Sequence, residues 1–333
     1  MTQKRRVLFW GLGLFLLGWL LHKVGLAEVW SHVRGMGWRF LPVIGISLLW
    51  HLSNTWAWAA CFDPNDKGRP GFVGLLHIKL SGEALGNVTP ASQVGGEVAK
   101  AYMLGKQVEV TRGVPSLVIN KTIEVVSGLA FALLGALVAF WQLSLPQEVQ
   151  IGLAAALVLA TTGIVAAFLS QRRSAFGWVL NLLRWLRLPF LEKRRDKVEA
   201  MDRNIAAFYR QNRKGFLVSL GLHAVSWALA VAEVYSILHI LGQPIPLVAA
   251  FLLTSLSLVI NTAFFFVPSG VGVFEGGHMF LFHLLGLGSG LGLAVGVIRR
   301  IRRVFWVLVG ALLLLPGIFS RSGADRPRGR PLP

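Results

Sequence analysis

The chain has 333 residues, of which 54% are hydrophobic and only 14% are charged. Soluble domains carry roughly 25% charged residues, so the composition excludes an ordinary soluble protein and indicates a membrane protein. The formal net charge of +18 does not indicate nucleic-acid binding, because most of it lies in three segments outside the apolar runs.

These three basic segments are the N-terminus, the region 170–214 and the tail after Phe319. Positively charged flanks mark the cytoplasmic side of a membrane protein. We therefore expect both termini and the central loop to be cytoplasmic, in a multi-pass protein of the bacterial inner membrane.

Apolar runs long enough to cross a bilayer recur along the chain. A spanning helix needs about 20 mainly apolar residues, and the runs predict helices at about 7–22, 41–62, 115–141, 151–169, 215–242 and 291–318. Between them, the regions 72–103 and 247–288 are interrupted by polar residues, proline and glycine. Irregular backbone at membrane depth is tolerated only inside protein or beside a water-filled cavity, so these regions predict two re-entrant helical hairpins.

The two interruptions have the same layout. The first reads Asn87-Val-Thr-Pro90-Ala-Ser-Gln-Val-Gly95-Gly96-Glu97. The second runs from Asn261 to Glu275 and contains Pro268, Gly270 and Gly272. In both, a glutamate follows the proline by seven residues. A polar break in each of two corresponding halves points to a binding site near the membrane midplane.

If the N-terminus is cytoplasmic and each predicted spanning helix crosses the membrane once, the first hairpin enters from the cytoplasm and the second from outside. This opposite orientation predicts an inverted repeat, with one half at about 41–141 and the other at about 215–318. Lys121 precedes Gly128 by seven residues, as Arg303 precedes Gly310. The predicted fold class is an all-α polytopic membrane protein, a single transmembrane domain over 1–333 with about six spanning helices, two hairpins, a basic loop at 170–214 and a disordered basic tail at 320–333.

Two basic regions leave alternatives open. Four arginines (299, 300, 302 and 303) fall inside the last predicted span, so they line a wet cavity or the span begins after them. The region 174–214 mixes aromatic and basic residues. It is either a surface helix that recruits anionic phospholipid or a cytoplasmic linker whose basic residues follow the excess of positive charge on the cytoplasmic side.

Around the first break, several polar residues are candidates for substrate binding. Backbone amides freed by Pro90, at the start of the following short helix, would suit an anion such as a phosphate. Glu97 is expected in the first turn of that helix, where the helix dipole stabilises a carboxylate, and Lys100 follows one turn later. The alternative is a capping acid with a salt-bridge partner.

Two further charged pairs have helical spacing. Lys79 and Glu83 are four residues apart, and Lys121 and Glu124 are three apart, so each pair shares a helix face. Each is either structural or part of a transport site. Together with Asn87, they complete the candidate substrate-binding residues of the first half.

In the second half, Glu275 and its neighbour Gly276 form a candidate site. Glu233 is a lone acid in its predicted span, either a proton carrier or a hydrogen-bonded structural acid. The histidines show no metal-ligand spacing, and Cys61 is the only cysteine, which rules out a cysteine cluster. We expect no metal and no cofactor.

At these residues the chain resembles the lysylphosphatidylglycerol synthase transmembrane-region family, also called flippase-like membrane proteins. The matching stretches are Asn87–Leu104, Ser116–Gly128 and Val267–Gly288. The sequence motifs Gln93-Val-Gly-Gly-Glu97 and Glu275-Gly-Gly look most like those of the branch associated with hopanoid biosynthesis. The resemblance implies a lipid-handling membrane domain with re-entrant helices, in relatives that move polar-headed lipids between leaflets.

The chain departs from the family pattern in two places. It ends at Pro333 without the soluble aminoacyltransferase domain of some relatives, so we expect that it does not synthesise the lipid. Where relatives often carry an acid–Arg…Asp pattern, this chain has Asn120-Lys121…Glu124, which leaves the headgroup specificity open.

The sequence therefore predicts a lipid transporter or flippase, in which Glu97 and Glu275 with Lys121 and Arg303 line a polar slot for a lipid headgroup. The expected partners are the lipid substrate and anionic phospholipid at the central loop. One alternative is an integral membrane enzyme that uses Glu97 or Glu275 as acid–base, although no recognisable nucleophile or metal cluster supports it. Another is an accessory subunit of lipid synthesis.

Overall fold

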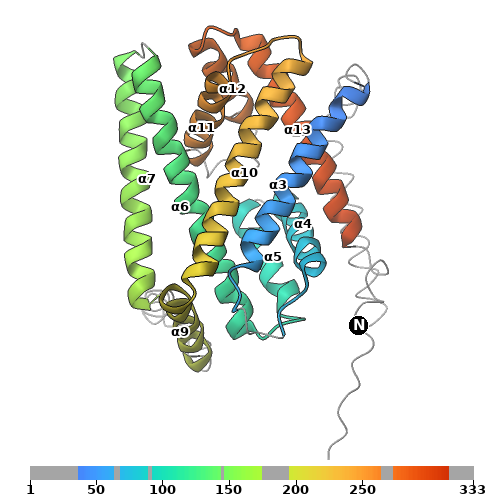
Figure 1. The fold of residues 1–333 in the computed structure, drawn as a ribbon, viewed down its shortest axis with the longest axis vertical. Coiled ribbons are helices and arrows are strands. Elements are labelled where there is room, and N and C mark those ends of the chain that lie inside the picture. The colour runs from blue at the N-terminus through green and yellow to red at the C-terminus, as the bar shows by residue number, and fades with distance from the viewer. Residues whose placement is uncertain are drawn as a thin grey trace, which may run out of the picture.

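The computed structural model describes residues 37–63, 68–88, 92–143, 146–174, 195–263 and 273–314. In these ranges the chain forms ten α-helices and one short 3-10 helix, and no strand. The all-α fold class is thereby confirmed for the described part of the chain. The helices α3, α6, α7, α10 and α13 run along the long axis of the molecule (Figure 1).

The helix bounds follow the apolar pattern closely. They are η1 Gly37–Phe40, α3 Leu41–Ala59, α4 Phe72–Val88, α5 Ser92–Leu104, α6 Val110–Gln142, α7 Gln147–Ser174, α9 Arg195–Gln211, α10 Arg213–Ile240, α11 Leu247–Ala263, α12 Val273–Leu284 and α13 Ser289–Leu313. Each predicted span after the first coincides with one helix, and each predicted hairpin region contains two. The first predicted span, at about 7–22, lies outside the described residues.

Two of the described helices, α6 and α10, are long and apolar enough to cross a membrane by length and composition alone, and α11 is apolar but shorter. Helix α3 carries His51 and Asn54, and α13 carries four arginines, which lowers their hydropathy. The total of about six spans and the inverted repeat of re-entrant hairpins therefore stay predictions.

The start of α6 corrects the predicted bound. The helix begins at Val110 rather than at about 115, so Pro115 lies inside it. Proline has no N–H to give to the carbonyl four residues earlier, which here belongs to Thr111. Asn204 of α9 donates its Nδ2 to that carbonyl oxygen at 2.7 Å. The bond lets the helix continue past the proline and fixes α9 against α6.

Two apolar cores lie in opposite halves of the molecule. The α4/α5 core joins both helices to α3, α6 and α9, with Trp58, Ile78, Leu104, Ile123 and Ile205 at its centre. The α11/α12 core joins those two helices to the other ends of α3, α6 and α10, with residues such as Val43, Ala139, Ile237, Leu253 and Phe282. Figure 1 shows α4, α5 and α9 in one half and α11 and α12 in the other.

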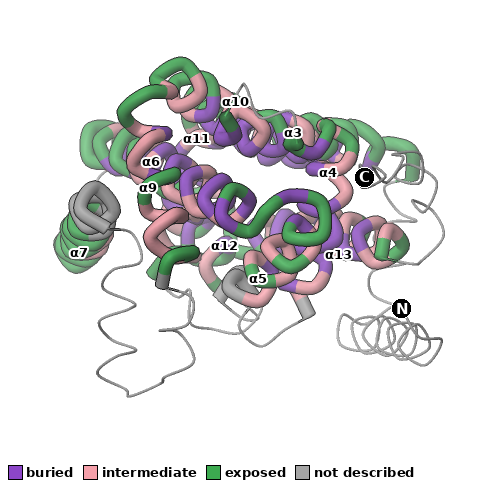
Figure 2. Tube along the Cα trace, turned by 90° about the horizontal axis from the view of Figure 1, so that it is seen from below, coloured by how far each residue is buried: buried purple, intermediate pink, exposed green. Residues whose placement is uncertain are grey.

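The outward faces of the bundle are also apolar. Trp141 is 91% exposed, and Leu159 and Leu217 are exposed to 74% and 64%. Figure 2 shows the buried residues on the inward faces, with α7 at the edge and largely exposed. Large exposed apolar surfaces mark contact with a membrane or another protein, and they agree with helices that face lipid.

Glycines allow the helices around α4 to approach closely. A Cβ atom added at Gly96 of α5 would lie 3.0 Å from the carbonyl oxygen of Gly82 in α4. A Cβ at Gly310 of α13 would overlap the carbonyl oxygen of Leu80 and lie 2.8 Å from the Cβ of Ala84. The backbones of α4 and α13 are therefore in near contact.

Gly310→Ala should lower the stability of the protein by about 1–3 kcal/mol, because overpacking against backbone forces the helices apart. The thermal unfolding midpoint of the full chain in detergent measures this. Gly221→Ala in α10 is the matched control, since a Cβ there meets nothing within 4 Å and alanine favours helix. Equal midpoints for Gly310→Ala and the wild type would contradict the close contact between α4 and α13.

Candidate functional site

Between the two apolar cores lies a layer of polar and charged side chains. Its most buried lysine is Lys79 of α4, which is 6% exposed. The Lys79 Nζ donates to Glu83 Oε1 at 2.5 Å and lies 3.1 Å from His51 Nδ1 of α3. It also lies 4.7 Å from the centroid of the Trp50 ring. A carboxylate, an imidazole nitrogen and an aromatic face thus surround the ammonium group, which compensates for its burial.

Two more pairs complete a charge-balanced group. Lys100 Nζ donates to Glu97 Oε1 at 2.8 Å on α5, and Lys121 Nζ donates to Glu124 Oε1 at 3.0 Å on α6. We call Lys79, Glu83, Glu97, Lys100, Lys121 and Glu124 the lysine–glutamate cluster. Its three lysines and three glutamates carry no net charge.

The three pairs of the lysine–glutamate cluster interact with one another. Lys100 acts electrostatically on Glu83 and on Glu124, and Lys121 acts on Glu97 and on Glu83. The side chains of Glu83, Glu97 and Glu124 are 30%, 33% and 34% exposed, whereas that of Lys79 is 8% exposed. The carboxylates are therefore accessible to a ligand, and the cationic end of Lys79 is not.

The structure thus brings six of the candidate residues from the sequence together in the lysine–glutamate cluster. The other candidates lie outside this cluster or outside the described residues. Asn87 donates to the backbone oxygen of Glu83 at 2.8 Å, so its amide nitrogen is used within α4. Arg303 lies half-buried on α13, and the contacts described for the cluster do not include it. Glu275 lies in the first turn of α12, but its side chain is outside the described residues.

The residues of the two predicted breaks are only partly described. Pro90, Pro268, Gly270 and Gly272 lie outside the described residues. Gly276 is exposed in α12, with open space beside it. Gly95 and Gly96 lie in α5, which begins at Ser92.

That start places Glu97 in the second turn of α5, so its predicted place in the first turn is wrong. The effect of the helix dipole falls off beyond the first turn. Lys100, rather than the helix terminus, is the partner of Glu97.

Hydrogen bonds between helices extend the polar layer. His223 Nε2 of α10 lies 3.2 Å from Asn120 Oδ1 of α6, and Asn54 Nδ2 of α3 donates to Ser226 Oγ at 2.9 Å. The bonded residues are 103 and 172 positions apart in the sequence. Nothing in the local sequence indicated them, because they depend on which helix faces meet.

A second charged group lies against α10. Arg302 of α13 donates to Glu233 Oε2 at 2.5 Å, and Arg299 Nε lies 3.6 Å from Glu233 Oε1. Arg299 also lies 3.1 Å from His278 Nε2 of α12. We call Glu233, Arg299 and Arg302 the arginine–glutamate cluster. Of the two alternatives for Glu233, these contacts match the hydrogen-bonded structural acid, and its partners come from a helix more than 60 residues away.

The arginines of α13 lie within one unbroken helix, Ser289–Leu313. The helix itself therefore begins before them, and both alternatives, a wet cavity or a membrane span that begins after the arginines, stay predictions. Trp306 on the same helix donates to Ser47 Oγ at 2.8 Å and has its ring 4.5 Å from that of His51. Arg302 also acts electrostatically on His51. The two charged clusters are thus connected through α3 and α13.

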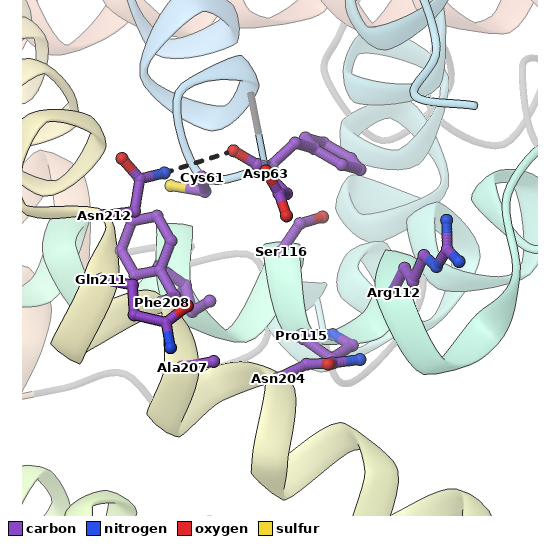
Figure 3. A pocket seen from close by; sticks show the side chains of 12 residues that line it. Cys61, Asp63, Arg112, Pro115, Ser116, Asn204, Ala207, Phe208, Gln211 and Asn212 are labelled. Atoms are coloured by element: carbon purple, nitrogen blue, oxygen red, sulfur yellow. Dashed lines mark hydrogen bonds between the residues drawn. The ribbon is translucent and has the colours of Figure 1, made fainter. Parts of the chain in front are cut away.

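A cavity of about 540 Å³ lies at the α9 end of the molecule (Figure 3), and the residues that line it belong to neither cluster. Its lining includes Phe62, Ser116, Asn204, Phe208, Gln211 and Asn212. Most of its polar groups already serve the fold. Ser116 Oγ donates to the Gly113 carbonyl at 2.7 Å, and Asn212 Oδ1 accepts from the Gly215 N–H at 2.8 Å. We therefore place the candidate site in the charged layer rather than in this cavity.

Helix α9 closes that end with a strongly amphipathic sequence. Ile205 and Phe208 are buried against the α4/α5 core, whereas Arg203 is 70% exposed. Burial also raises the pKa of Tyr209 to about 12, so its phenol stays neutral and its ring adds to the packed face. The part of the central segment that the structure describes thus contains a packed surface helix.

No group of three or more His, Cys, Asp and Glu residues in the described ranges has a geometry that could hold a metal ion. The charged layer consists of carboxylates that pair with ammonium and guanidinium groups.

A helical bundle with apolar outer faces and a buried charged layer is typical of an integral membrane protein. The family described as "Lysylphosphatidylglycerol synthase TM region" matches residues 7–311, and the chain belongs to this family. It is also similar to a "UPF0104 membrane protein" of Methanothermobacter thermautotrophicus, at 23% identity over 256 residues, which covers 71% of this chain and 73% of the relative. No solved structure is significantly similar to the chain.

These comparisons confirm the resemblance at the level of the family. They give no support to the hopanoid-associated branch, so that assignment stays a prediction.

Proposed function

We propose that this protein is a lipid transporter, a flippase that moves a polar-headed lipid between the leaflets of a bacterial inner membrane. The observation that carries the proposal is the lysine–glutamate cluster. Charged groups at membrane depth are costly, and they mark substrate or ion pathways. A balanced set of accessible carboxylates and lysines would exchange partners with a lipid headgroup, while the acyl or polycyclic tail stays in the bilayer.

Alternating access would come from movement of the two halves around the charged layer. In this proposal α4 with α5 and α11 with α12 are the re-entrant hairpins of an inverted repeat, entering from the cytoplasm and from outside. Their places in opposite halves of the molecule (Figure 1) support it. Both termini and the α9 surface would face the cytoplasm, where basic residues are favoured.

The substrate class follows from the same chemistry. A headgroup that carries an amine or a hydroxyl would bind Glu97 and its neighbours, as in an aminoacylated phospholipid or a modified hopanoid. The family description, which names a lysylphosphatidylglycerol synthase, supports the first of these.

Glu97→Gln should slow lipid translocation by about tenfold, because a hydrogen bond to a charged group contributes about 1.5–3 kcal/mol and each 1.4 kcal/mol is tenfold. The measurement is the accessibility of a labelled aminoacylated phospholipid to an outside reagent in reconstituted vesicles. Glu109→Gln is the matched control, since the Glu109 side chain is 65% exposed outside the cluster. Glu275→Gln tests the second half in the same assay.

Wild-type translocation in both Glu97→Gln and Glu275→Gln vesicles would reject the proposed pathway. Lipid analysis of a deletion strain separates transport from synthesis. A lipid that is intact but in the wrong leaflet supports transport, whereas complete loss of the lipid supports an enzyme and contradicts the flippase.

A further inference from the structure

His51 of α3 is a buried histidine that lies between two opposite charges. Its side chain is 6% exposed, and its Nδ1 lies 3.1 Å from the Lys79 ammonium and 3.5 Å from Glu83 Oε2. An ammonium group has three donors and no acceptor, so in this arrangement Nδ1 accepts a hydrogen bond from Lys79 and carries no hydrogen. The imidazole is therefore neutral, with its hydrogen on Nε2.

One added proton would change the partner of this nitrogen. Both nitrogens of a protonated imidazole are donors, so Nδ1 would repel the Lys79 ammonium and donate to Glu83 Oε2. The other carboxylate oxygen, Glu83 Oε1, is already 2.5 Å from Lys79 Nζ. The three side chains therefore have two arrangements that differ by one proton. Histidine suits such an exchange, because it is the side chain that changes its charge near neutral pH.

Charged groups from several helices surround His51. Those that act on it electrostatically include Lys79 and Glu83 of α4, Lys100 of α5 and Arg302 of α13, and Arg302 is itself held by Glu233 of α10. The cations disfavour a proton on His51 while Lys79 stays in contact with it, so proton binding must move Lys79. Glu124 of α6 also acts on Lys79, which gives the displaced ammonium a second carboxylate to approach.

A proton can reach His51 through Glu83. The side chain of Glu83 is 30% exposed, whereas that of His51 is 6% exposed. A proton from water would bind Glu83 Oε2 and pass to His51 Nδ1. In this step the O–H bond breaks and the N–H bond forms, so the carboxylate is restored as the partner of Lys79 and of the imidazolium.

We propose that His51 binds and releases one proton in each transport cycle, so that lipid movement is coupled to proton movement. Proton binding separates Lys79 of α4 from α3, which lets the lysine–glutamate cluster exchange partners. Ionisable side chains inside membrane proteins serve as proton relays in pumps and transporters. This inference rests on the proposed function and adds a second substrate to it, the proton.

The test applies a pH difference of about one unit, which is a tenfold ratio of protons, across vesicles that contain the purified full chain. A potassium ionophore holds the membrane potential at zero. The probes are the labelled aminoacylated phospholipid and a pH-sensitive dye trapped inside. With one proton per lipid, the lipid should reach an about tenfold difference between the leaflets, and protons should move as it does. Protein-free vesicles give the response of the lipid itself to pH.

His51→Gln removes the proton site and keeps the contact with Lys79, because a glutamine carbonyl accepts a hydrogen bond but the amide does not bind a proton. Folded His51→Gln protein should give no lipid difference and no proton movement beyond those of protein-free vesicles. His223→Gln on α10 is the matched control. His223 is also buried, at 1% exposed, but its Nε2 lies 3.2 Å from the neutral amide of Asn120, so this variant should keep the tenfold difference.

The outcomes separate the proton site from the flippase. Lipid that is translocated but evenly distributed in wild-type vesicles would overturn the proton site and keep the flippase, whether or not His51→Gln folds. A lipid difference that persists in His51→Gln, or that is lost equally in His223→Gln, would also overturn the site. Proton movement that requires His51 in vesicles that translocate no lipid would reject the flippase and keep the proton site, and the absence of both movements would reject both.

Discussion

Glu83→Gln should destabilise the protein by about 3–5 kcal/mol, because it leaves the Lys79 ammonium buried without its carboxylate. Lys79 is 6% exposed, and its remaining neighbours, His51 and Trp50, carry no formal negative charge. The thermal unfolding midpoint of the full chain in detergent measures the loss. Glu124→Gln is the matched control. Its partner Lys121 is 37% exposed, so water can solvate the freed ammonium and the loss should be below about 1 kcal/mol.

The double variant Lys79→Met/Glu83→Gln separates folding from transport. Removing both charges of a buried pair is often neutral or stabilising, so the unfolding midpoint should return close to that of the wild type. If Glu83 binds the headgroup, translocation should stay impaired in this folded double variant. Full recovery of translocation together with stability would assign the pair a structural role only.

Glu233→Gln should also cost about 3–5 kcal/mol, since it takes the shared carboxylate away from two arginines. The side chain of Glu233 is 2% exposed, so water cannot substitute for it. Glu199→Gln on α9 is the matched control, because the Glu199 side chain is 44% exposed and lies 4.0 Å from Arg203. Such surface pairs contribute at most about 1 kcal/mol. A Glu233→Gln variant that is as stable as the wild type would contradict the pairing of Glu233 with Arg299 and Arg302.

The helices were predictable because their signals are local. Apolar run length, and proline or glycine at the breaks, gave α3, α4, α5, α10 and α13 to within a few residues. The start of α6 was missed because its compensation comes from another helix, through the bond of Asn204 to the Thr111 carbonyl. A local rule cannot anticipate such a partner.

In the candidate site, too, local contacts could be predicted from the sequence and contacts between helices could not. The pairs Lys79–Glu83, Glu97–Lys100 and Lys121–Glu124 could be predicted, since spacings of three and four residues place side chains on one helix face. The contacts of His51 with Lys79 and of Glu233 with Arg302 span 28 and 69 residues and depend on how helices pack. The run of arginines on α13 did signal that an acid was needed, and Glu233 was a candidate within the same half of the sequence.

The close packing of α13 on α4 also bears on how the protein is made. Gly310, near the end of the last described helix, rests on the backbone of Leu80, which leaves the ribosome more than two hundred residues earlier. Until synthesis reaches α13, the polar face of α4 lacks its final cover, and Glu233 lacks its arginines. The close packing of α4 and the pairing of Glu233 are thus completed only when the last described helix has been made.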